Sequence, residues 1–285
     1  MSEFSVISDP VDVRAVERAL ARTYDSPTHA DPWTAIEEYE RVRRVAAAHP
    51  GKGSAALSGV VGLPRSRIRT WIDGDGMPDA YRGIRTAADR GWLCSRWDVD
   101  SLRGLNALVA SVYAGGSIAT GSYVPRVVAA DACEYAVCAG AADRLGVALE
   151  RKTDAPPEYE PRRDASVLGR LLVAYGCPQG GKCSDTVTSL PPYLDAAPRP
   201  LRCEFAQVYV ALRGHDRSDR PGVQISESRS GGYRAELEAL FVDVVGDASD
   251  VSADAWPIYI SGDAYETLTR PPQFASSRDA ASRSA

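Results

Sequence analysis

Two stretches of the chain share one pattern of apolar positions, LNALVASVYAGG at 105–116 and FAQVYVALRG at 205–214. In each, apolar side chains fill positions i, i+3, i+4 and i+7, the spacing of one helix face: Leu105, Leu108, Val109, Val112, Phe205, Val208, Tyr209 and Leu212. Both stretches end in glycine, carry alanines between the larger side chains and precede a β-rich run. The pattern predicts two short helices that pack closely together, and a supersecondary unit that occurs twice through internal duplication.

The first hundred residues show helical spacing in further segments. A helix is expected within 10–24, and another from 31 to 49, where Asp31 can cap and Pro32 can occupy the first turn. A helix over 54–61, a turn at Gly62 and Leu63, and a second helix that opens at Pro64 match the plan of a DNA-binding helix-turn-helix. One more helix is expected from Pro78 to Gly91.

The second helix of that motif begins with several basic residues. In a helix-turn-helix its N-terminal residues lie nearest the base edges, and here these are Arg65, Ser66, Arg67 and Arg69. Arginine suits the position because its planar fork binds guanine or clamps phosphate. Ile68, Trp71 and Ile72 have the spacing to face the core. Lys52 and the backbone N–H groups around Ser54 are expected to hold a phosphate. The alternative is a solvated basic face in a small helical bundle.

The rest of the chain divides into two similar series of elements. The predicted segments are helices 101–114, 132–145, 166–176, 201–213 and 233–245, a strand pair within 118–130, and strands 147–152, 222–228 and 256–261. DAPPEYEPRRD at 154–164 is expected to be a loop. A closing turn is expected at 263–268, and a disordered tail from 269 onward, because few apolar residues follow.

This arrangement resembles the LAGLIDADG homing endonuclease family over roughly 101–268. The resemblance rests on the two glycine-terminated helices and on LGRLLVAYGCPQGGK at 168–182 followed by LPPYL, which is similar to the segment that links the halves in many archaeal members. It implies an αββαββα unit occurring twice, a central pair of helices, and sheets that grip double-stranded DNA. It also implies a Mg²⁺-binding carboxylate before each terminal glycine. Gly115 and Arg213 hold those positions, and neither binds a hard cation.

The expected fold class is therefore α+β, with a helical helix-turn-helix domain followed by a pseudo-twofold LAGLIDADG-like duplication. The predicted divisions are an N-terminal extension (1–30), a helix-turn-helix domain (31–97), a first half (98–176), a second half (177–268) and the tail (269–285).

Composition limits the possible functions of the chain only in part. The net charge of −5 creates no global attraction for nucleic acid, so contacts must come from local basic patches. The scarcity of lysine and the wealth of aspartate and alanine suggest a haloarchaeal source, or codon bias alone. The six cysteines form no CxxC pair, and no apolar run reaches membrane-spanning length. A cytoplasmic protein without membrane contact is expected.

Residues for catalysis are not evident. Nucleotide-binding, hydrolase and metalloprotease motifs are missing from the sequence, so we expect no enzyme activity, cofactor or metal. A displaced metal site built from Asp216 with Asp131, Glu134 or Asp185 is the alternative, and would make the chain a residual endonuclease or nickase. A third hypothesis makes the C-terminal region a protein-interaction or ligand-sensing module.

The sequence thus predicts a monomeric, site-specific double-stranded DNA-binding protein, a transcriptional regulator on a scaffold that no longer cuts. Basic residues on the predicted sheets and loops are further candidate DNA contacts, each with a solvated surface role as the alternative: Arg126, Lys152, Arg162, Arg163, Lys182, Arg229 and Arg234. Arg82 and Arg85 are candidate accessory phosphate contacts.

Overall fold

The computed structural model describes residues 6–154, 156–180, 187–216, 221–252 and 257–269. Over these residues the chain folds into twelve α-helices and two four-stranded antiparallel sheets, which confirms the α+β class. Lys182, Asp185 and the tail predicted to be disordered lie outside the described residues, except for Thr269 at the end of the last helix.

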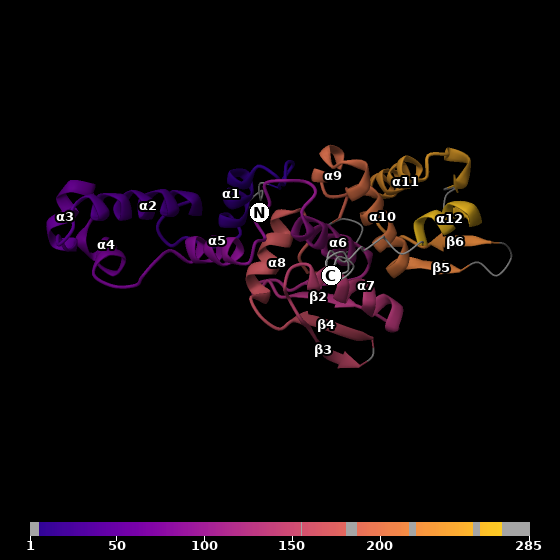
Figure 1. The fold of residues 1–285 in the computed structure, drawn as a ribbon, viewed down its shortest axis with the longest axis horizontal. Coiled ribbons are helices and arrows are strands. Elements are labelled where there is room, and N and C mark those ends of the chain that lie inside the picture. The colour runs from indigo at the N-terminus through magenta and orange to yellow at the C-terminus, as the bar shows by residue number, and fades with distance from the viewer. Residues whose placement is uncertain (1–5, 155, 181–186, 217–220, 253–256, 270–285) are drawn as a thin grey trace, which may run out of the picture.

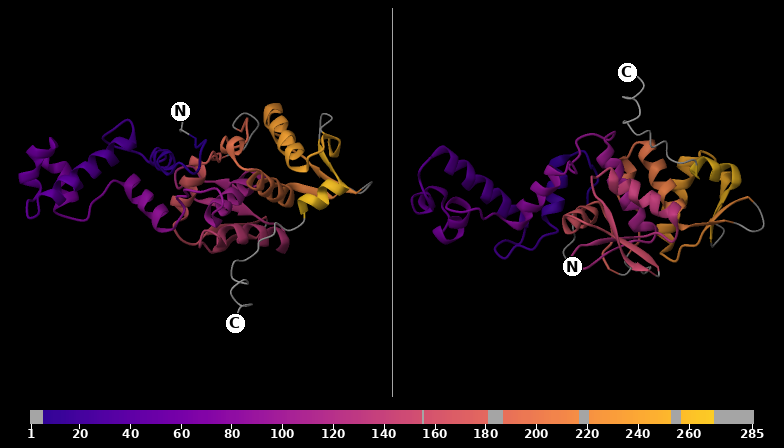
Figure 2. Two further views of the ribbon diagram at one scale, coloured as in Figure 1. Left: turned by 45° about the horizontal axis from the view of Figure 1, so that its top comes forward. Right: turned by 60° about the horizontal axis from the view of Figure 1, so that its bottom comes forward.

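The N-terminal third is helical, as predicted. Its helices are α1 (Val13–Ala21), α2 (Pro32–Ala48), α3 (Ser54–Val61), α4 (Arg65–Ile72) and α5 (Asp79–Asp89). Asp31 caps α2 by accepting a hydrogen bond from the Trp33 backbone N–H at 3.1 Å. Helix α2 leads away from the rest of the molecule and carries α3 and α4 at its far end (Figures 1 and 2). We call residues 41–75 the arm and the remainder the body.

The body repeats one order of elements. First come α6 (Asp100–Ala114), β1 (Ser117–Ile118), β2 (Pro125–Val128), α7 (Ala132–Asp143), β3 (Leu149–Asp154), β4 (Pro157–Pro161) and α8 (Ala165–Ala174). After α9 (Tyr193–Ala196) come α10 (Arg199–Arg213), β5 (Gly214–Asp216), β6 (Gly222–Ile225), α11 (Gly231–Val245), β7 (Val251–Ser252), β8 (Ile258–Ser261) and α12 (Gly262–Thr269). The strand orders are β1-β2-β4-β3 and β5-β6-β8-β7, so both sheets are built alike.

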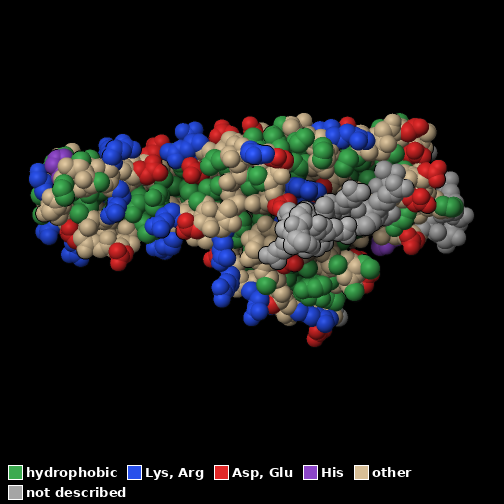
Figure 3. Space-filling model, viewed as in Figure 1, with side chains coloured by type: hydrophobic (Ala, Val, Ile, Leu, Met, Phe, Trp, Pro, Cys, Tyr) green, Lys and Arg blue, Asp and Glu red, His purple; other side chains and the backbone are tan. Residues whose placement is uncertain are grey.

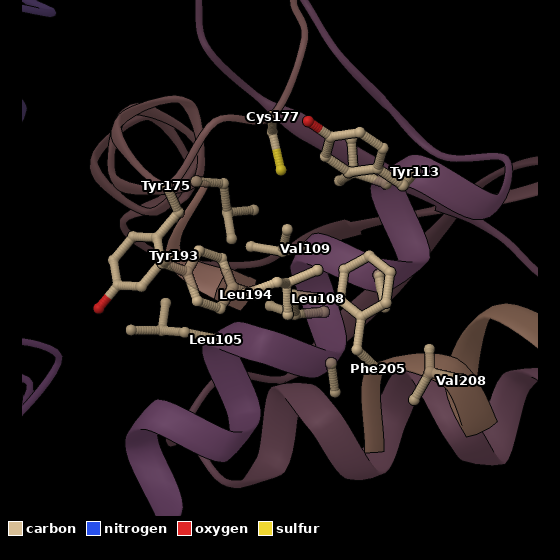
Figure 4. Packing of buried hydrophobic residues seen from close by; sticks show 14 of the residues in the cluster. Leu105, Leu108, Val109, Tyr113, Tyr175, Cys177, Tyr193, Leu194, Phe205 and Val208 are labelled. Carbon is tan, nitrogen blue, oxygen red and sulfur yellow. The ribbon is translucent and has the colours of Figure 1, made fainter. Parts of the chain in front are cut away.

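Helices α6 and α10 pack against each other at the centre of the body, and we call this contact the seam. Small side chains such as Ala107, Ala110 and Ala206 are buried along these helices, which lets the backbones approach closely. The rings of Tyr113 and Phe205 lie 6.3 Å apart. Figure 4 shows aliphatic and aromatic side chains of both helices filling one core. Burial of each large aliphatic side chain contributes about 1.5–3 kcal/mol to stability, so the seam holds the two repeats together.

Polar groups also cross the seam. The buried Asn106 of α6 donates a hydrogen bond to the Leu201 carbonyl at 3.0 Å and accepts one from the Tyr193 hydroxyl at 2.8 Å. Glu204 of α10 accepts hydrogen bonds from Arg103 at 3.2 Å and from Arg144 at 2.7 Å. Because each buried group is paired, the polar atoms fix the register of the two helices without an unsatisfied group.

The prediction of a loop at 154–164 is wrong, because β4 lies there between β2 and β3. Tyr159 pairs with Val127 on one side and Arg151 on the other, and its ring packs against Tyr135 of α7 at 4.6 Å. Pro157 and Pro161 are the first and last residues of the strand, where a missing N–H is tolerated.

The hydrophobic cores do not follow the predicted domain divisions, which remain predictions. Helices α1 and α5 and the beginning of α2 share the large core of the body. A separate small cluster in the arm consists of Val42, Val61 and Ile68, with Val45, Leu63, Trp71 and Ile72 packed around it. Helix α2 therefore belongs to both cores and joins the arm to the body.

Candidate nucleic-acid interface

A tight turn of three residues, 62–64, joins α3 to α4. Gly62 adopts φ +69°, a left-handed conformation that glycine reaches without strain. The Ser58 carbonyl accepts hydrogen bonds from the backbone N–H groups of Gly62 at 3.0 Å and Leu63 at 3.3 Å. The Ser58 hydroxyl donates to the Leu63 carbonyl at 2.7 Å. These bonds end α3 and fix the direction in which α4 begins.

A second tie joins the other ends of α3 and α4. The Asp73 carboxylate, just beyond α4, accepts hydrogen bonds from the Ser54 backbone N–H at 2.9 Å and the Ser54 hydroxyl at 2.5 Å. The hydrogen bond from the Ser54 hydroxyl has the larger effect and the one from the backbone N–H the smaller, and together they hold the pKa of the Asp73 carboxyl below its ordinary value of 3.8. The prediction that Ser54 holds a phosphate is corrected, because its side chain is buried and an acidic group of the protein already occupies the start of α3.

Helix α4 is anchored by the small core of the arm. Ile68 is fully buried there, and Trp71 meets the ring of Tyr39 edge-on at 5.5 Å. Arg43 of α2 donates to the Trp71 carbonyl at 3.1 Å, which satisfies a backbone group near the end of the helix. Ile68, Trp71 and Ile72 thus face the core, as the sequence predicted.

The opposite face of α4 carries polar and basic side chains. Arg65, Ser66 and Arg69 are exposed, and neither arginine makes an ion pair or hydrogen bond with a described residue. Their spacing of one and three residues places them on one side of the helix, at its N-terminal half. This face offers two free guanidinium groups and a hydroxyl to a ligand.

Arg67 does not belong to that face. Its guanidinium lies 2.7 Å from Glu38 of α2, donates to the Thr28 hydroxyl at 3.0 Å and also contacts His29. The same group lies 6.0 Å from the ring of Trp71. The prediction that Arg67 contacts bases is corrected, because its two-residue offset from both Arg65 and Arg69 turns it to the opposite side of the helix, where it ties α4 to the body.

Exposed, unpaired cations continue beyond α4. Lys52, as predicted, lies exposed in the turn before α3, and Arg41 and Arg44 of α2 are exposed too, each without an ion pair to a described residue. Sequence analysis missed the two arginines of α2, although their position opposite the apolar stripe could have identified them. The arm carries seven basic and two acidic residues, a net charge of +5, in a chain of net charge −5. Figure 3 shows basic side chains spread over this end of the molecule.

The basic residues of the first sheet are neutralised instead. Arg126 of β2 pairs with Glu160 at 2.7 Å and Glu158 at 3.3 Å, and its hydrogen bond to Glu160 raises its pKa. Lys152 of β3 pairs with Glu150 and lies 3.7 Å from Glu160. A third cation, Arg162, lies 3.6 Å from Glu150, so three cations face three carboxylates and the cluster carries no excess positive charge.

Arg229 is buried within the body, which corrects its assignment as a DNA contact. It pairs with Glu227 at 3.3 Å, donates to the Tyr113 carbonyl at 2.6 Å and lies over the Tyr233 ring at 4.6 Å. Burial raises the pKa of the neighbouring Tyr209 hydroxyl well above its ordinary value, so this hydroxyl stays protonated and donates to Glu227 at 2.6 Å. The network joins the two repeats near the end of the seam.

The two helix ends at which the LAGLIDADG resemblance implies metal-binding acids hold no carboxylate. Gly115 caps α6, and Arg213 is the last residue of α10. Among the described residues, no group of three His, Cys, Asp or Glu side chains is arranged to hold a metal ion. Asp131 caps α7 instead, and Asp216 lies 3.5 Å from the Tyr265 hydroxyl.

Comparison with known protein families and with curated proteins finds no match to this chain. In the part of the chain that the structure describes, every helix is too short or too polar to cross a membrane.

Proposed function

We propose that the chain binds double-stranded DNA through the arm, with α4 in the major groove. The observation that carries the proposal is the exposed face of α4, where Arg65, Ser66 and Arg69 make no ion pair or side-chain hydrogen bond with a described residue. Arginine reads guanine edges with two hydrogen bonds, and serine adapts to several bases. Lys52, Arg41 and Arg44 then contact phosphates beside the groove and fix the register of the helix.

The clamp at Asp73 and the turn at Gly62 support this role. Base reading requires a helix held at a fixed angle, and both ends of the α3–α4 pair are tied by hydrogen bonds. Arg67 adds a third tie, because it joins α4 to α2 through Glu38. These contacts therefore hold α4 at a fixed orientation within an arm whose surface is basic.

The body supports a regulator rather than a nuclease. Its twice-repeated order of helix, two strands, helix, two strands and helix, and its central pair α6 and α10, agree with the LAGLIDADG-like scaffold inferred from sequence. The positions of the family's metal-binding acids hold Gly115 and Arg213. We infer that the body stabilises binding at a specific site without cutting it, as a transcriptional regulator would require, and that one chain suffices.

Selection from a random pool tests the proposal. The full chain is incubated with random double-stranded DNA at moderate salt with Mg²⁺, and the retained fragments are sequenced. We expect a shared motif with intact ends. Enrichment no greater than that of an R65A/R69A double variant would refute DNA reading by α4, and cleaved ends would favour the nuclease. R96A is the matched control, since Arg96 lies exposed in the body beside Asp98.

A further inference from the structure

A cavity of about 260 Å³ lies between α4 and the body. One wall comes from Arg67 and Trp71 of α4, and the facing wall from residues 77–80, which lead into α5. The loop between α1 and α2 closes a third side with residues 25–28. The three walls come from different segments of the chain, and only the first belongs to α4.

The lining is apolar inside and acidic at the mouth. Pro32, Ala35, Met77, Pro78 and Ala80 provide the apolar surface, together with the Trp71 ring. Asp25 is exposed at the edge and makes no ion pair or hydrogen bond with a described residue.

The charged groups around the cavity do not balance. Asp79 pairs only with Arg82 of its own helix, at 3.0 Å, and both side chains are largely exposed. Among the described residues of the lining Arg67 is the one cation, but its terminal nitrogen is engaged by Glu38, Thr28 and His29, and its unpaired Nε is buried away from solvent. The charge left without compensation is therefore negative.

We propose that this cavity binds a small amphipathic cation, a protonated amine attached to an apolar or aromatic body. The apolar body fits against Trp71 and Met77, where it leaves water, and the ammonium group stays at the mouth beside Asp25 and Asp79. A carboxylate ligand does not fit, because it would meet two carboxylates and no available cation.

Such a ligand would act on the arm. It would bridge α4 to the segment before α5 and so restrict the angle between arm and body, which is otherwise maintained by α2 and the contacts of Arg67. If the arm reads DNA, the ligand changes DNA affinity. This regulatory link rests on the proposed function, whereas binding of the amine does not.

Three matched probes test the site on the full chain. They are 2-phenylethylamine, 2-phenylethanol and 3-phenylpropanoate, which share an aromatic body and differ in charge. Affinity is measured by isothermal titration calorimetry. We expect the amine to bind about three- to fivefold more tightly than the alcohol, because an exposed ion pair contributes modestly, and the carboxylate to bind most weakly.

Two sets of variants locate the site. In D25N/D79N the preference for the amine over the alcohol should vanish, while D75N/D89N, which removes two exposed carboxylates outside the cavity lining, should keep it. A35L should fill the cavity and weaken both probes, with circular dichroism to verify folding. Equal affinity of the three probes, a preference that survives D25N/D79N, or no detectable binding of the amine would overturn the proposal.

The DNA measurement is kept separate. If the amine binds as described and shifts the salt dependence or affinity of DNA binding, the regulatory link is supported. If it binds and DNA affinity is unchanged, the link is refuted while the cavity stands. Failure of the chain to bind DNA at all would refute the proposed function and leave the calorimetric result intact.

Discussion

The arginines of α4 differ in whether their side chains are available to a ligand. Arg65 and Arg69 are exposed and unpaired among the described residues, whereas Arg67 lies against Glu38 and Trp71. The three residues are identical in type and follow one another at two-residue intervals, so helical periodicity alone separates the two exposed arginines from the one that packs against α2.

Arg67→Ala should destabilise the arm and leave base preference unchanged. The variant loses an ion pair, a hydrogen bond and a contact with Trp71, together about 1–2 kcal/mol in the free energy of unfolding. Urea unfolding followed by Trp fluorescence measures the loss, with R65A as control. A variant that keeps its stability but prefers different bases would show that Arg67 reads DNA after all.

The clamp between Asp73 and Ser54 should depend on pH. The folded-state pKa of Asp73 is lowered, so the carboxylate contributes stability above its unfolded-state pKa near 3.8, and that contribution disappears as pH falls through the folded-state value. Thermal melting of wild type and D73N should therefore differ at pH 7 and converge below pH 3.8. D75N, an exposed carboxylate beside the clamp, should match wild type throughout. A difference between wild type and D73N that persists at the lowest pH would contradict the assignment.

At the scale of elements, the arm depends on a very small core. Its buried apolar side chains are few, with Val42, Leu57, Val61 and Ile68 among them, whereas a much larger core runs through the body. The arm should therefore open before the body does, because local stability follows the apolar area that each unit buries.

Ile68→Ala should melt the arm alone. Truncation of this buried side chain costs about 3 kcal/mol, which is a large share of the stability that so small a core can supply. Hydrogen exchange should show lost protection in α3 and α4, with α6 and α10 unchanged. V60A removes an exposed side chain of α3 and serves as the control. Loss of protection in α6 as well would mean that the two cores unfold as one.

At the scale of the whole molecule, the seam unites two sequence-distant halves. Glu204 of α10 is almost wholly buried and joins Arg103 of α6 to Arg144, which follows α7. Removal of one member of a buried ionic group leaves the others without compensation.

Glu204→Ala should cost about 3 kcal/mol in the free energy of unfolding, because two arginines remain partly desolvated. Chemical denaturation measures the loss against E266A, an exposed glutamate of α12. A cost no larger than that of E266A would show that the seam relies on its apolar side chains alone.

The sequence predicted what local patterns determine. Asp31 and Pro32 located the start of α2, Gly62 located the turn of the arm, and helical spacing identified α6 and α10. The sequence did not predict features that depend on contacts between residues far apart along the chain. The prolines of β4 favour a loop, whereas its pairing with β2, distant in sequence, makes it a strand. The charge of Arg229 favours a surface position, whereas its hydrogen bond to the Tyr113 carbonyl and its ion pair with Glu227 hold it inside the body.

The central claim is that α4 reads base edges through Arg65 and Arg69. The most direct test repeats the random-pool selection with R65A and R69A separately and compares each motif with that of wild type. We predict that each variant loses preference at one position of the site and about 1–3 kcal/mol of binding free energy there, while R96A selects the wild-type motif. Identical motifs and affinities for wild type, R65A and R69A would contradict the account.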